Sequence, residues 1–257
     1  MNIKFIILGC GSSMGVPRAD GFWGKCDPEE TKNYRTRCSA LIQTKYSNTL
    51  IDTSPDLRNQ LINNNIKNID RVIFSHSHAD QTHGINDLRI FYLKNNKKIP
   101  VYSDAVTSSY LKKTFPYCFK NYPGYPAFLK LNKINENLFF KENKKNIKIK
   151  VIKVKHGRIK SLSFIINNKC GYASDVNLIY KKDLKFFYNL DFLVIDCLRY
   201  NFHPSHYTLN EILKLIKIIN PKKTILTNLH SDLDYNLLLK KLPKNVIPAH
   251  DGLSLNL

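Results

Sequence analysis

The sequence predicts an α/β protein, and three observations support this class. Short runs rich in Ile, Val and Phe recur along the chain, as they do in buried strands. Stretches with apolar residues at helical spacing lie between several of these runs. The 257 residues have a hydrophobic content of 43%, which is enough to bury a substantial core. No repeat, linker or low-complexity spacer divides the chain, so we expect one domain over residues 1–257 with loop-rich insertions at 9–38 and 116–146.

Nine segments have the composition of strands, because β-branched and aromatic residues dominate them. In chain order they are residues 3–8, 39–44, 48–53, 71–76, 148–156, 161–167, 170–175, 191–196 and 223–229.

Two segments predict helices with defined ends. In SPDLRNQLINNN, Ser54 has the character of an N-cap and Pro55 suits the first helical position. In TLNEILKLIKIINP, Thr208 and Glu211 form a capping box and Pro221 ends the helix. The apolar residues of both segments recur at helical spacing, so each helix can cover one face of a sheet.

Composition limits the function classes. The net charge of +20 invites a nucleic-acid interpretation, but much of the lysine lies in asparagine-mixed segments typical of solvated loops and strand edges. We therefore do not favour nucleic-acid binding, although the charge agrees with an anionic substrate. The six cysteines are scattered without a CxxC motif, which indicates a reducing cytoplasm. No apolar run approaches the ~20 residues of a membrane span, and the run 5–8 is too short for a signal peptide.

Histidines and acids follow the predicted strands. The segment SHSHADQTHG contains His76, at the end of the predicted strand 71–76. His78, Asp80 and Gln81 follow just after it. Other such residues end or follow the later strands: His156, Asp175, Asp196 and His230. Imidazole and carboxylate together suit Zn, Mn or Fe, and two cations ~3.5–4 Å apart can clamp a phosphoryl group. The pattern predicts a metal site at a shared sheet edge.

The ordered series of motifs resembles one family. LGCGSSMGVPR, WGKCDP, NYRTRCS, LIDTSPDLR, HSHADQTHGINDLR, KIPVY, VKHG, GYASDV, ILTNLHSDLDY and HDG follow one another along nearly the whole chain. The series resembles the metallo-β-lactamase-fold hydrolases, whose signature is HxHxDH after a strand, and more closely the PhnP-like phosphoribosyl cyclic phosphodiesterase family. The resemblance implies a four-layer αββα metallo-β-lactamase sandwich with two divalent metal ions, Zn or Mn.

The same resemblance implies the metal ligands. The first ion would be bound by His76, His78, His156 and Asp175. The second would be bound by Asp80, the residue at Gln81, the bridging Asp175 and a C-terminal histidine. An ungapped match places Asn228 at that last position, but His230 is the only imidazole nearby, so we predict His230 as the ligand. Because an amide is a weaker ligand than imidazole, we expect Gln81 to weaken the second site.

An accessory zinc site occurs in some PhnP-like proteins and is built from closely spaced cysteines and a late histidine. Here Cys26 stands alone in its loop and Ser231 occupies the late position, so we predict that this site is absent.

Catalysis and substrate binding are assigned to the remaining polar residues. By resemblance His206 is the general acid, although it can instead cap or orient the helix that follows, and Asp80 joins it among the catalytic residues. Candidates for substrate binding are Arg89, His203 and Asn228, with Arg18 and Arg37 as further phosphate binders. His83 and Asp87 are predicted to orient ligands, and His250 to be structural.

The predicted function is a metal-dependent phosphodiesterase. A metal-held hydroxide would attack phosphorus in a small, cyclic phosphodiester such as a ribose cyclic phosphate, and His206 would protonate the leaving oxygen. Two alternatives stay open: an RNA-processing nuclease of the same superfamily, and a non-hydrolytic one-metal PqqB-like accessory protein. We expect a cytoplasmic protein with a small-molecule substrate and no membrane partner. A homodimer is left open.

Overall fold

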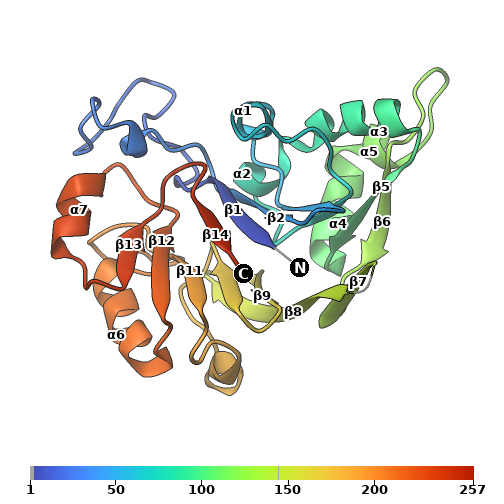
Figure 1. Cartoon of the computed structure of the whole chain (residues 1–257). Helices are drawn as coiled ribbons and strands as arrows, with labels where there is room; N and C mark the ends of the chain where they lie inside the picture. Colours follow the sequence, from blue (N-terminus) through green and yellow to red (C-terminus); the bar gives the residue numbers. More distant parts are fainter. Residues whose placement is uncertain (1–2, 144) are drawn as a thin grey trace.

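The computed structural model describes residues 3–143 and 145–257 and contains two seven-stranded mixed sheets packed face to face (Figure 1). The strands of the first sheet, in spatial order, are β14 (Ser254–Asn256), β1 (Lys4–Gly9), β2 (Ser39–Gln43), β3 (Asn48–Ile51), β4 (Arg71–Ile73), β5 (Ile99–Ser103) and β6 (Leu129–Lys133). Those of the second are β13 (Val246–Pro248), β12 (Lys223–Thr227), β11 (Phe192–Asp196), β10 (Cys170–Ala173), β9 (Ile159–Ile166), β8 (Lys145–His156) and β7 (Asn137–Glu142).

Helices cover the outer face of each sheet (Figure 1). The α-helices are α1 (Leu57–Asn63), α2 (Ala79–Thr82), α3 (Arg89–Asn95), α4 (Ala105–Thr114), α5 (Pro116–Phe119), α6 (Leu209–Ile219) and α7 (Tyr235–Lys241). Three 3₁₀ helices are η1 (Thr31–Asn33), η2 (Ile85–Leu88) and η3 (Lys181–Phe186). Helices α1, α3 and α4 pack on the first sheet, and α6 and α7 on the second. The predicted αββα sandwich is confirmed.

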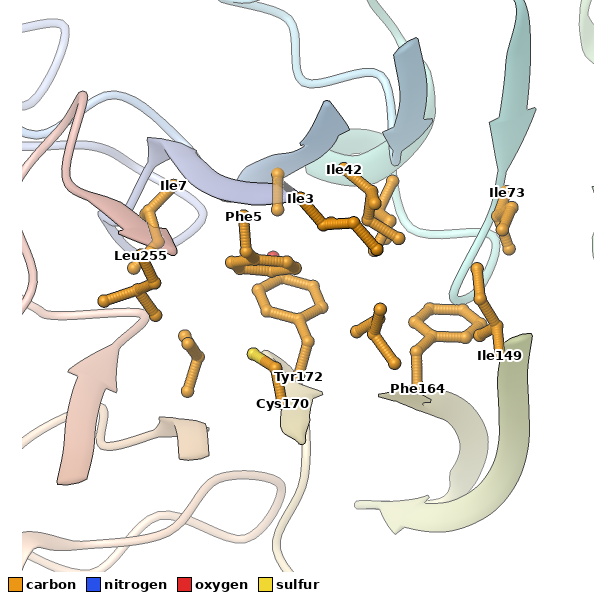
Figure 2. Packing of buried hydrophobic residues seen from close by; sticks show 14 of the residues in the cluster. Ile3, Phe5, Ile7, Ile42, Ile73, Ile149, Phe164, Cys170, Tyr172 and Leu255 are labelled. Carbon is orange, nitrogen blue, oxygen red and sulfur yellow. The ribbon is translucent and has the colours of Figure 1, made fainter. Parts of the chain in front are cut away.

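The central core lies between the two sheets. Phe5 of β1 and Tyr172 of β10 meet there with ring centroids 5.4 Å apart, and Ile42 and Phe164 pack beside them (Figure 2). Strands buried on both faces read as continuous apolar runs, because helices cover one side and the opposite sheet covers the other. This is why β2, β11 and β12 were recognisable from composition alone.

Parallel strands determine where the site forms. The neighbours β3, β4, β5 and β6 run parallel, and so do β10, β11, β12 and β13. Their carboxyl ends therefore lie at one edge of each sheet, where α/β folds place ligands.

Two sequence expectations need correction. The N-cap of α1 is Asp56 rather than Ser54, and the hydroxyl of Ser54 instead accepts a hydrogen bond from the backbone N–H of Asp56. The insertion expected at 116–146 contains α5, β6 and β7, while its residue 144 lies outside the described residues. Both strands are edge strands with many polar residues, so their composition did not mark them.

Candidate metal centre

Three histidines meet where strands of the two sheets end. His76 and His78 lie between β4 and α2, and His156 is the last residue of β8. The ring centroids of His76 and His78 are 4.5 Å apart, and each lies 5.1 Å from that of His156. One ligand nitrogen from each ring lies within 4.8 Å of the other two. With metal–nitrogen bonds of about 2.0–2.1 Å, small side-chain rotations let one ion contact all three.

Asp175 adds a carboxylate to these imidazoles. It follows β10 by two residues and is 3% exposed. Its carboxylate oxygen forms a second close group with a ring nitrogen of His156 and one of His206. A buried carboxylate beside several imidazoles is typical of a metal ligand, because an unpaired buried charge is costly.

The tautomer of His76 is fixed by a serine and an aspartate. The hydroxyl of Ser75 donates to Oδ2 of Asp52 at 2.7 Å, and its oxygen lies 3.0 Å from Nδ1 of His76. Because the serine hydrogen is committed to Asp52, Nδ1–H of His76 is the donor to Ser75, and the lone pair is left on Nε2. That Nε2 is buried and has no hydrogen-bond partner among the described residues. Burial lowers the pKa of His76 to about 3, so the ring is neutral, as a metal ligand must be.

His156 is oriented by the backbone. Its Nδ1–H donates to the carbonyl oxygen of Ser205 at 2.8 Å, which directs Nε2 toward the other histidines. Burial lowers the pKa of His156 and keeps it neutral too. Three imidazoles, a carboxylate and an orphaned buried Nε2 fit a divalent transition-metal ion.

Gln81 lies beside the carboxylates rather than apart from them. Its Nε2 donates to Oδ2 of Asp80 at 3.2 Å and to Oδ2 of Asp175 at 3.4 Å. Burial and the nearby charge of Asp175 raise the pKa of Asp80. The two carboxylates therefore repel each other, and a positive charge in this part of the site would stabilise both.

His206 forms an ion pair with Asp196, the last residue of β11. Nδ1–H of His206 donates to Oδ2 of Asp196 at 2.6 Å. Burial alone would lower the pKa of His206, but the carboxylate of Asp196 raises it to about 9. The imidazole ring is also 4.7 Å from that of His156, between centroids. The carboxylate of Asp196 thus favours the protonated form of His206, which lies next to the histidine cluster.

The C-terminal position is occupied by Asn228 rather than His230. Asn228 follows β12 directly, and its Nδ2 donates to Oδ1 of Asp175 at 3.2 Å and to the carbonyl of Ser174 at 2.8 Å. His230 belongs to neither close group of potential ligands among the described residues. Its Nδ1 instead accepts from the backbone N–H of Asp232 at 3.3 Å. The structure thus brings Asn228 to Asp175 and does not bring His230 there.

The substrate-binding candidates lie in different places. His203 lies beside His206, with ring centroids 5.0 Å apart. Arg89 is at the start of α3, where its guanidinium stacks on Tyr125 and lines a groove that contains none of the histidines. Arg37 makes a bidentate pair with Asp56, at 2.5 and 2.7 Å.

The loop that contains Cys26, where we predict no accessory zinc site, is bound to the loop after β12 by the buried Arg35. Arg35 donates to the carbonyls of His230 and Leu233 at 3.3 and 2.7 Å. Sγ of Cys26 donates to the carbonyl of Ser231 at 3.4 Å. These bonds connect the loop before β2 with the loop after β12.

Sequence reasoning assigned no role to the groups that orient the site, although it noted Asp196 at a strand end. Asp52, Ser75 and the carbonyl of Ser205 hold the ligand histidines, and Asp196 holds His206. His83, predicted for such a role, instead lies 3.0 Å from the hydroxyl of Tyr110 through its Nε2. One signal for Asp196 is present in the sequence. It ends β11, and a site residue follows each neighbouring strand: Asp175 follows β10 and Asn228 follows β12.

Known proteins share this architecture. A family model described as a β-lactamase superfamily domain matches residues 47–228. The crystal structure of a new diphosphatase from the PhnP family has a TM-score of 0.88 and 28% identity, covering 100% of this chain and 98% of that one. Zn²⁺-bound PqqB from Methylobacterium extorquens has a TM-score of 0.80 at 15% identity, covering 99% and 100%.

A curated relative is 29% identical over 98% of this chain and is named octanoyltransferase, from Porphyromonas gingivalis strain ATCC BAA-308 / W83. The chain spans about half of that protein, 51% of its length. Among the described residues, no helix has the length and apolar character to cross a membrane. The family match covers most of the chain, and the αββα layers agree with it. The chain therefore belongs to the β-lactamase superfamily domain family and is a metallo-β-lactamase-fold, PhnP-like protein.

Proposed function

We propose that this chain is a metal-dependent hydrolase of small phosphodiesters, with a cyclic phosphate of ribose as the model substrate. The observation that carries the proposal is the position of His206, whose Nδ1 is held by Asp196 at 2.6 Å next to the histidine–aspartate cluster. The PhnP-family neighbour is described as a diphosphatase, so a diphosphate linkage is a second substrate of the same chemistry.

The residues that would bind the ion are His76, His78, His156 and Asp175. A divalent ion at such ligands supplies a Lewis acid and lowers the pKa of bound water. Asp52 and Ser75 keep Nε2 of His76 available, and the carbonyl of Ser205 does the same for His156.

His206 would supply the proton for the leaving oxygen. Its Nδ1 is engaged by Asp196, so Nε2–H is the group free to donate. The positive ring also favours an anionic phosphoryl group beside it. After bond cleavage, His206 regains its proton from solvent, and Asp196 holds the ring in the same orientation throughout.

The leaving-group dependence of His206→Gln tests this role. Removal of a general acid should lower kcat about 10²–10⁴-fold for an alkyl ester, whose alkoxide leaves poorly. For bis-p-nitrophenyl phosphate the loss should be much smaller, because p-nitrophenolate leaves without a proton. His203→Gln is the matched control and should not show this split. Equal losses of kcat on both esters would reject His206 as the acid.

Asp175→Ala tests the metal dependence. We expect loss of bound metal and of turnover together, measured by elemental analysis and by hydrolysis of bis-p-nitrophenyl phosphate, a ribose cyclic phosphate and a nucleoside diphosphate ester. Absence of turnover for the native chain with every divalent metal would overturn the proposed hydrolase and favour a non-hydrolytic accessory protein.

A further inference from the structure

Two side-chain amides occupy opposite sides of the buried Asp175 carboxylate. Nε2 of Gln81 lies 3.4 Å from Oδ2 of Asp175, and Nδ2 of Asn228 lies 3.2 Å from Oδ1. Gln81 also donates to Asp80, at 3.2 Å. Each oxygen of Asp175 thus receives a hydrogen bond from an amide, and one of these amides bridges to the second carboxylate.

These amides stand where a second cation would need ligands. The nitrogen of an amide NH₂ group has no lone pair available to a metal, so it hydrogen-bonds to a carboxylate and does not itself bind an ion. His230, the imidazole predicted for this position, is turned toward Asp232, with Nδ1 3.5 Å from Oδ2 of that residue. The donor set on this side is therefore two carboxylates that are already hydrogen-bonded. The imidazole in close reach of Asp175 here is His206, which is the proposed general acid and whose Nδ1 is engaged by Asp196.

Asn228 is fixed in this arrangement by its backbone and by a second bond. Its φ of 62° is in the left-handed region, which asparagine tolerates better than most residues. Its Nδ2 also donates to the carbonyl of Ser174 at 2.8 Å, and the residue is 2% exposed. A group held by two acceptors and a constrained backbone is not free to turn away for an incoming ion.

A hard, oxygen-seeking ion fits no better. The amide oxygen of Gln81, Oε1, is buried without a hydrogen-bond partner among the described residues. Mg²⁺ requires near-octahedral coordination and usually keeps several waters. Gln81 is 0% exposed and Asp175 3%, so these two side chains offer a hydrated ion no solvent-facing ligand.

We propose that this chain holds a single transition-metal ion, bound by His76, His78, His156 and Asp175, and that Gln81 and Asn228 replace a second ion. Their N–H groups satisfy Asp80 and Asp175, which a second cation would otherwise bridge. This inference rests on the metal centre of the proposed function, but it concerns the number of ions and not the reaction.

Metal titration provides the test. The metal-free chain is titrated with Co²⁺, followed by its visible absorption, and the Zn²⁺ content is measured after reloading and gel filtration. We expect saturation at one equivalent for the native chain. The double variant Gln81→His/Asn228→His should saturate at two, because it supplies two imidazoles beside Asp80 and Asp175. Histidine is also tolerated in the left-handed region, so the variant should fold.

Two controls separate the inference from the proposed function. Asn137→His adds an imidazole at an exposed position of β7 and should leave the value at one equivalent. His76→Ala should bring the native value to zero. Two ions on the native chain, of any divalent metal including Mg²⁺, would overturn the single-ion inference while leaving the metal centre intact. Saturation of the folded double variant at one equivalent would also overturn it, because the amides would then not be what excludes the second ion. No bound ion at all would instead reject the proposed metal centre.

Discussion

At the scale of single residues, the site depends on which nitrogen of each imidazole is engaged. His76, His156 and His206 all have Nδ1 occupied, by Ser75, the Ser205 carbonyl and Asp196 respectively. This leaves every Nε2 facing the interior of the site. The difference between a neutral ligand and a protonated acid is then set by the partner, because only His206 is paired with a carboxylate.

Asp196 should act as a positioning residue. In Asp196→Asn the amide oxygen can still accept from Nδ1–H, but the negative charge that keeps His206 protonated is lost. We expect kcat for an alkyl phosphodiester to fall about 10²-fold, within the range for a general acid, with KM and metal content unchanged. Steady-state kinetics and elemental analysis measure the two separately. A rise in KM with constant kcat would show that Asp196 acts on substrate binding.

The sequence identified the imidazoles but not which neighbour holds them. His76, His78, His156 and Asp175 each end or follow a strand, and the family resemblance implies these four as ligands. For the C-terminal ligand the sequence favoured His230 over Asn228, because both follow β12 and imidazole is the better metal ligand. The structure distinguishes them: Asn228 takes a left-handed backbone that turns its amide toward Asp175, and His230 is two residues farther along the chain. Such a local turn has no signature in composition.

At the scale of elements, α6 illustrates a fully predictable helix. Oγ1 of Thr208 accepts from the backbone N–H of Glu211 at 3.3 Å, and the Glu211 carboxylate accepts from the backbone N–H of Thr208 at 2.8 Å. The capping box predicted from these two residues is confirmed. By contrast β6 and β7 were missed, because an edge strand is defined by its pairing with a neighbour and not by its own residues.

Thr208→Ala should weaken the start of α6. Loss of an N-cap costs about 1 kcal/mol of unfolding free energy, a decrease that denaturant titration resolves. Thr208→Ser, which keeps the hydroxyl, should retain most of that stability. If the alanine and serine variants were equally destabilised, the threonine methyl group and not the cap would be the source of the effect.

At the scale of the whole molecule, Asp251 joins segments from the two ends of the sequence. Its carboxylate accepts from the backbone N–H of Cys10 at 3.0 Å and from that of Thr36 at 2.8 Å. Burial raises the pKa of Asp251 to about 6, although its hydrogen bonds oppose the shift. The protonated acid is therefore favoured by folding, and its contribution is present at low pH and lost as pH rises through about 6.

Asp251→Asn, which carries no titrating group, should remove this contribution. The difference in unfolding free energy, wild type minus variant, should fall by about 2 kcal/mol between roughly pH 4.5 and pH 7. Denaturant unfolding at a series of pH values measures it, and taking the difference cancels the titration of every other group. A difference that is constant with pH would show that the pKa of Asp251 is the same in the folded and unfolded chain.

The pairing of β1 with β14 also determines how the molecule responds to force. Lys4 is opposite Asn256, and Ile6 is opposite Ser254, so both chain ends leave the same end of one antiparallel ladder. A load applied between the two ends pulls perpendicular to the strands and breaks the ladder hydrogen bonds one after another, not all at once. Mechanical failure therefore begins as a peeling of β14 at low force, while the strands that carry the metal ligands, β4, β8 and β10, lie farther inside their sheets.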